Sequence, residues 1–189
     1  MDSLITTLVS VMLAEMGDRT QILAAVLALR FRDDRRVLAG LMLATLANCS
    51  MSAIGGSVID NMISEAPLRL FNALAYVFAG VGMLLWRRRV DILSGGKTGA
   101  FVTSFLGLFV LELGDKSQFI ILANAAQTPV WPITIVGGWI GIMTACAPAI
   151  YLRERLATML PIAKIRIAGG FVLTVWGLMQ GVRAFGLIG

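Results

Sequence analysis

The sequence EMGDRTQ at residues 15–21 returns as ELGDKSQ at residues 112–118, 97 positions later. Each of these two signatures places two carboxylates and one cation in the middle of an otherwise apolar segment. A charge at the centre of a membrane helix costs about 2.5–3.5 kcal/mol on insertion scales, so six of them cost on the order of 15 kcal/mol before pairing. Apolar side chains would avoid that cost, and the repeated signature therefore indicates a functional site.

The composition of the whole chain is that of an integral membrane protein. Of its 189 residues 58% are hydrophobic and 14% are charged, and the mean hydropathy is +0.84, whereas soluble domains carry roughly 25% charged residues. The net charge of +5 does not indicate nucleic-acid binding, because the basic residues lie in clusters between apolar segments. The chain has no histidine, so carboxylates must handle any protons. Its cysteines, Cys49 and Cys146, are interpreted as small hydrophobes.

Six segments are long and apolar enough to form membrane-spanning helices, which need about 20 residues each. They are Ser3–Leu29, Val37–Ile59, Pro67–Trp86, Gly99–Ala126, Val130–Leu152 and Ile167–Ile188. The first and fourth carry the two signatures at their centres. The remaining connections are short, so we expect no soluble domain with a separate activity.

The basic residues predict the orientation of these spans. Twelve of the sixteen lie in the connections after the first, third and fifth spans, and the positive-inside rule places those connections in the cytoplasm and both termini outside. The twelve are Arg30, Arg32, Arg35, Arg36, Arg87, Arg88, Arg89, Lys97, Arg153, Arg155, Lys164 and Arg166. Two more, Arg69 and Arg183, lie on the other side, and the last two belong to the signatures.

The predicted fold class is all-α: a single membrane domain of six transmembrane helices, built from residues 1–90 and 98–189 as two three-helix repeats. Three spans is an odd number, so the second repeat enters the membrane in the opposite direction. Such inverted repeats are common in secondary transporters, where the site forms at the repeat interface. The glycines of the third and sixth spans, Gly80 and Gly177 among them, are interpreted as close helix-packing positions.

The two signatures supply the candidate cation ligands. In a continuous helix Glu15, Asp18 and Gln21 share one face at three-residue spacing, and the second signature repeats this pattern. Crossing of the two helices would gather four carboxylates and two amides, whose oxygen atoms suit Ca²⁺ or Mn²⁺ better than Zn²⁺ or Cu⁺. The predicted metal ligands are Glu15, Asp18, Gln21, Glu112, Asp115 and Gln118.

Further polar and glycine residues are predicted to support the site. They are Gly17, Arg19, Thr20, Asn48, Gly114, Lys116 and Ser117. Each glycine either unwinds its helix or admits a neighbouring helix, and the sequence does not decide between the two. The cations follow Glu15 and Glu112 by four residues, so a purely structural alternative is an ion pair within each helix that makes it insertable.

The charges of the predicted site suggest a mechanism. Four carboxylates and two cations sum to −2, which balances one divalent ion. Because ionised carboxylates repel one another at short range, the empty site is expected to bind protons that a metal then displaces. One site that binds metal or protons in alternation is the minimum for an antiporter.

The paired signatures resemble those of uncharacterised protein family 0016, which includes bacterial manganese exporters and Golgi exchangers of Mn²⁺ or Ca²⁺ for protons. The resemblance covers nearly the whole chain and implies that Glu15, Asp18, Glu112 and Asp115 form the cation site. Eukaryotic members usually carry an N-terminal presequence and a longer central loop, and this chain has neither. A multi-pass protein of the bacterial inner membrane is therefore expected.

We accordingly expect a cation/proton antiporter that exports Mn²⁺ or Ca²⁺, has no permanently bound cofactor and is not an enzyme. Its partners would be the cation and membrane lipid, and a homo-oligomer stays open. A cation channel is a first alternative, but it needs a continuous polar path, and outside the signatures the helices offer little beyond hydroxyls and Asn48. An intramembrane enzyme needs a substrate surface at one membrane face. Export of a small organic solute is the third alternative.

Overall fold

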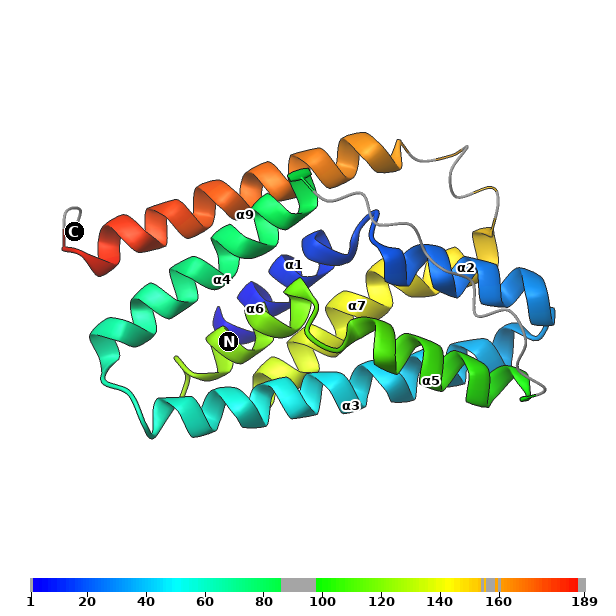
Figure 1. The fold of residues 1–189 in the computed structure, drawn as a ribbon, viewed down its shortest axis with the longest axis horizontal. Coiled ribbons are helices and arrows are strands. Elements are labelled where there is room, and N and C mark those ends of the chain that lie inside the picture. Colours follow the sequence, from blue (N-terminus) through cyan, green and yellow to red (C-terminus); the bar gives the residue numbers. More distant parts are fainter. Residues whose placement is uncertain (1, 86–97, 154, 156–158, 160, 187–189) are drawn as a thin grey trace.

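The computed structural model of the chain describes residues 2–85, 98–153, 155, 159 and 161–186. The described part folds into helices (Figure 1). They are α1 (Asp2–Glu15), α2 (Arg19–Phe31), α3 (Asp34–Asp60), α4 (Glu65–Leu85), α5 (Ala100–Glu112), α6 (Lys116–Ala125), α7 (Pro132–Leu152) and α9 (Ile162–Ala184). The basic residues Arg87, Arg88, Arg89 and Lys97, on which part of the orientation rests, lie outside the described residues.

Four of these helices, α3, α4, α7 and α9, are long and apolar enough to cross a membrane. The helix α5 is apolar but shorter. The expectation of an α-helical membrane protein agrees with this architecture. Orientation and the number of crossings stay predictions.

The first and fourth predicted spans are not continuous helices. The first divides into α1 and α2 and the fourth into α5 and α6, with the break in each case inside the signature. The prediction that Glu15 and Asp18 share one helical face is therefore wrong, because Glu15 ends α1 and Asp18 caps the start of α2. The helix α9 also begins earlier than predicted, at Ile162. Its first turns carry the basic residues Lys164 and Arg166, which are typical of a connection between spans and therefore mask the start of the helix in the sequence.

Glycine causes both breaks. Gly17 has a φ of 78° and Gly114 a φ of 72°, in the left-handed region that side chains with a Cβ rarely adopt. The side chain one turn further on stabilises each break. Gln21 Oε1 accepts a hydrogen bond from the Gly17 N–H at 3.1 Å, and Gln118 Oε1 accepts one from Gly114 at 3.0 Å. The signature thus encodes a helix, an unwound turn and a second helix.

The helices recur with the spacing of the signatures. The last residues of α1 and α5 lie 97 positions apart in the sequence. The same distance separates the first residues of α2 and α6, and the first residues of α4 and α9. This offset is what duplication of a three-helix unit predicts, although it does not establish how the two units cross a membrane.

Helices α3 and α7 pack against each other at the centre, α1 lies along α7, and α5 along α3. Figure 1 shows α4 and α9 side by side along one edge of the molecule. Their backbones approach closely at glycines: a Cβ added to Gly80 would lie 2.5 Å from the carbonyl oxygen of Gly170, and one added to Gly177 would lie 2.7 Å from the Val77 nitrogen. The interpretation as helix-packing positions is confirmed at Gly80 and Gly177 but not at Gly82, where an added Cβ would meet none of the described residues within 4 Å.

Candidate cation site

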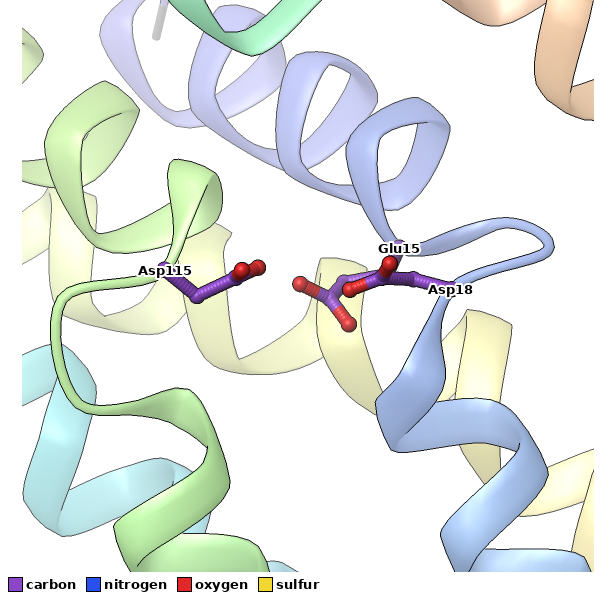
Figure 2. Close-up of side chains that lie close together, drawn as sticks. All are labelled: Glu15, Asp18 and Asp115. Atoms are coloured by element: carbon purple, nitrogen blue, oxygen red, sulfur yellow. The ribbon is translucent and has the colours of Figure 1, made fainter. Parts of the chain in front are cut away.

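The two breaks bring three carboxylates together. Glu15 comes from the end of α1, Asp18 from the start of α2 and Asp115 from the start of α6 (Figure 2). One oxygen from each lies within 4.8 Å of the others. Ca²⁺–oxygen distances of about 2.3–2.6 Å place opposed ligands roughly 5 Å apart. One divalent cation would therefore fit between the three groups, and the smaller Mn²⁺ would need them to close slightly.

The broken helices also point their dipoles at this place. Helices α2 and α6 begin at the aspartates, so their N-terminal N–H groups favour the ionised carboxylates. Helices α1 and α5 end at Glu15 and Glu112, so their C-terminal carbonyl groups favour a cation. Half-helices that end near the membrane midplane form ion sites of this kind in secondary transporters.

Each signature cation pairs with the aspartate of the other signature. Arg19 Nη2 lies 3.1 Å from Asp115 Oδ1, and Lys116 Nζ lies 2.6 Å from Asp18 Oδ2. The lysine also donates to Asp115 Oδ2 at 3.0 Å. The alternative of Glu15–Arg19 and Glu112–Lys116 ion pairs within each helix is therefore wrong, since Arg19–Asp115 and Lys116–Asp18 join segments 96 or more positions apart in the chain.

The two glutamates have different surroundings. Glu112 accepts a hydrogen bond at 3.3 Å from Asn48 Nδ2, which also donates to the carbonyl oxygen of Phe109. Neither oxygen of Glu15 accepts a hydrogen bond of ordinary geometry within the described part of the chain, although the Ser117 hydroxyl lies beside it. Both glutamates are buried, at 0% and 1% exposure. The structure thus groups Glu15 with the aspartates and holds Glu112 next to them.

The remaining predicted residues have mainly structural contacts. The Oε1 atoms of Gln21 and Gln118 bond to the glycine amides, and Gln21 Nε2 donates to the carbonyl oxygen of Ala145 at 2.7 Å. These glutamine oxygens therefore satisfy the glycine amides of the unwound turns. Thr20 is buried in the first turn of α2.

A cavity of about 730 Å³ reaches the aspartates from one side. Asp18, Asp115 and both signature cations line it, together with Arg166 of α9. Arg166 is not among the predicted site residues, because its basic neighbourhood in the sequence is typical of a connection between spans. Gly17 also permits close approach, as a Cβ there would lie 2.9 Å from Ile162 Cγ2. Gly17 thus both unwinds its helix and admits a neighbour, whereas an added Cβ at Gly114 would meet none of the described residues within 4 Å.

The fold and the site together define an α-helical membrane transporter for cations. Several helices are apolar and of membrane-spanning length, two predicted spans are broken at charged signatures, and carboxylates cluster at the breaks. Comparison with known proteins agrees. The family described as divalent cation/proton antiporter GDT1 matches residues 3–91 and 100–186, and the chain belongs to this family.

Individual relatives extend over most of the chain. A Vibrio cholerae protein named "Putative manganese exporter" is 34% identical over 182 residues, which cover 92% of this chain and 88% of the relative. GDT1-like protein 3 of Arabidopsis thaliana is 26% identical over 206 residues, covering 94% and 67%. The divalent cation/proton antiporter GDT1 of Saccharomyces cerevisiae is 31% identical over 107 residues, covering 57% and 38%. No solved structure matches the chain.

Proposed function

We propose that the chain exports Mn²⁺ from the bacterial cytoplasm in exchange for protons, at a site formed by Glu15, Asp18 and Asp115. The convergence of these three carboxylates, from both signatures, within 4.8 Å carries the proposal. Oxygen ligands of this kind suit Mn²⁺ and Ca²⁺. Mn²⁺ is placed first because a relative that covers most of the chain carries a manganese exporter's name.

A metal ion that binds the aspartates must replace the signature cations that contact them. Lys116 contacts both aspartates, and Arg19 contacts one of them. A divalent ion that ligates the same oxygens must therefore displace the ammonium group, and protons on the carboxylates must leave. When the metal departs, the lysine and the protons return. This alternation couples metal release to proton binding without a second site.

The side from which the site is reached fits export. The cavity lies beside the end of α4 and the start of α9. The charge distribution predicts that both of these helix ends face the cytoplasm. In this arrangement the aspartates receive the cation from the cytoplasm, and Glu15, which does not line the cavity, lies deeper. This supports alternating access over a channel, which needs a continuous polar path.

The test uses the full chain in liposomes that contain a pH-sensitive dye. Mn²⁺, Ca²⁺, Mg²⁺ and Zn²⁺ are added in turn outside, and proton movement and metal uptake are recorded together. We expect Mn²⁺ to move protons, and Asp18→Asn and Asp115→Asn each to reduce the rate at least a hundredfold. Asp60→Asn is the matched control, since Asp60 is exposed at the end of α3.

The results separate the alternatives. Metal flux without proton movement indicates a channel and would overturn the antiport proposal. A chain that moves no metal would favour an organic solute. If both aspartate variants exchange Mn²⁺ for protons at the rate of Asp60→Asn, the site assignment is wrong.

A further inference from the structure

A second polar cluster lies inside the helix bundle, away from the signatures. Its centre is Asn124 of α6, whose Nδ2 donates to Thr7 Oγ1 and to the Tyr76 hydroxyl oxygen, both at 3.1 Å. Asn124 Oδ1 accepts a hydrogen bond from Asn72 Nδ2 at 3.0 Å. Ser10 completes the cluster through a 3.0 Å contact with Tyr76. All five side chains are buried, and they come from α1, α4 and α6.

This cluster lies on the opposite side of the carboxylates from the cavity. Thr7 precedes Glu15 by eight residues in α1, which is about 12 Å along the helix at 1.5 Å per residue. Asn124 follows Asp115 by nine residues, near the far end of α6. The two helices lead away from the breaks toward the same end of the molecule (Figure 1). A cation that leaves the site away from the cavity must therefore pass this layer.

The equivalent place in the other half is built differently. Shifting by 97 positions replaces Asn72, Tyr76 and Asn124 with Gly169, Leu173 and Leu27. The helix α4 packs against α6, but no comparable packing joins the equivalent helices α9 and α2 within the described ranges. The cavity separates them, with Ile22 of α2 and Arg166 of α9 in its wall, and it also reaches Phe78 of α4 and Phe119 of α6. One end of the path is closed by hydrogen bonds, and the other is open.

We propose that Asn72, Tyr76 and Asn124 form a gate that holds α4 against α6, and that transport requires α4 to release α6 while α9 closes onto α2. The inference rests on the alternating access proposed above. If the two halves are inverted repeats, an exchange of their arrangements produces the second state, with the opening on the other side.

The chemistry of the layer suits a gate that opens to water. Hydrogen bonds between polar side chains in membrane helices are individually weak, since alternative partners are available. When the layer opens, water satisfies the same donors and acceptors. An apolar layer would expose hydrophobic surface on opening, which is unfavourable. The polar cluster can therefore close the path firmly enough to block ions and still separate in each cycle.

Two cysteine pairs report the two states, in a chain that carries Cys49→Ala and Cys146→Ala. The rings of Phe78 and Phe119 lie 5.4 Å apart between α4 and α6, so the Phe78→Cys/Phe119→Cys pair reports the closed gate. The equivalent positions on α9 and α2 are Val175 and Ile22. The Ile22→Cys/Val175→Cys pair is expected to cross-link only when α9 closes onto α2. A short bis-methanethiosulfonate reagent, which joins two thiols through reducible disulfide bonds, is applied to the full chain in liposomes.

The gate variants should shift cross-linking from one pair to the other. We expect Asn124→Leu to raise cross-linking of the α2–α9 pair at least threefold and to lower that of the α4–α6 pair. Tyr76→Phe, which removes only a hydroxyl group, should shift both in the same directions to a smaller extent. Asn61→Leu is the control, because Asn61 is exposed and its side chain donates to the carbonyl oxygen of Ser57 in its own helix. A merely structural defect would lower both cross-links together.

Transport supplies the second measurement. Cross-linking either pair should stop proton-coupled Mn²⁺ movement, and reduction of the link should restore it. The gate proposal is overturned if the chain transports at the full rate while the α4–α6 pair is linked. It is also overturned if the α2–α9 pair stays unlinked in Asn124→Leu and under every gradient. Reciprocal cross-linking in a chain that moves no metal would leave the gate standing and refute the cation assignment.

Discussion

Replacing Lys116 by methionine removes the ammonium group that lies between Asp18 and Asp115. Its Nζ atom is 2.6 Å from one carboxylate and 3.0 Å from the other, and the three side chains are only 9%, 20% and 11% exposed. At an effective dielectric constant of about 20, unit charges 4 Å apart attract by roughly 4 kcal/mol. Loss of one partner from a buried pair costs about 3–5 kcal/mol, because the other charge stays buried.

We expect Lys116→Met to lower the stability by about 3 kcal/mol, the lower end of that range, because Asp115 keeps its contact with Arg19. For a chain of this size the thermal midpoint in detergent should fall by roughly 6–12 °C. Adding Asp18→Asn to the same chain should recover part of the loss, with a coupling energy of at least about 1.5 kcal/mol in the double-mutant cycle. Lys164→Met, at an exposed position of α9, is the control.

The same substitution tests competition between the lysine and the cargo. Without the ammonium group, Mn²⁺ should bind at least tenfold more tightly, a gain of about 1.4 kcal/mol, and should raise the midpoint of Lys116→Met more than that of the parent chain. Titration calorimetry and thermal shifts measure both effects. The reasoning is refuted if the stability losses of Lys116→Met and Asp18→Asn simply add in the double variant. It is also refuted if Lys116→Met binds Mn²⁺ more weakly than the parent chain does.

Three further outcomes follow from the geometry. Gly114→Ala should lower the free energy of unfolding by about 1–2 kcal/mol, because of its left-handed backbone alone. Gly17→Ala should lower it further, because an added Cβ there would also contact Ile162, and equal thermal shifts of the two variants would contradict this. Asn48→Ala should destabilise by about 1–3 kcal/mol, since it leaves buried Glu112 without its amide donor, and should slow Mn²⁺ exchange, whereas Ser50→Ala should do neither. Gly80→Val should abolish assembly of α4 with α9, measured by resistance to proteolysis, while Gly82→Ala should be tolerated because, in the part of the chain that the structure describes, no atom lies within 4 Å of the added Cβ.

Helix boundaries recur at the 97-residue spacing of the signatures, as a duplicated unit would produce, and the inverted arrangement of the two halves stays a prediction. The spacing could not predict the breaks. Apolar segments flank both charged signatures, so a hydropathy average over the segment predicts one continuous span across Gly17 and across Gly114. The break depends on a glutamine that bonds back to the glycine amide, and sequence alone does not reveal whether that bond forms.

The ion-pair partners of the signature cations also could not be predicted from the sequence. A four-residue spacing from Glu15 to Arg19 predicts an intrahelical pair, and only the fold reveals that Asp115 is nearer to the guanidinium group. The gate was missed for a related reason. Asn72 and Asn124 are single polar residues in apolar segments, and neither has significance until α4 and α6 come together.

The reciprocal pairing of Arg19 with Asp115 and of Asp18 with Lys116 has a consequence for biosynthesis. The ribosome delivers α1 and α2 before α6 exists, so the early chain holds Asp18 and Arg19 before their final partners have been made. Until α6 enters, these charges must remain near water or pair with each other. The first half therefore reaches its final arrangement only after the second half arrives, and a chain truncated between them should be a substrate for membrane quality control.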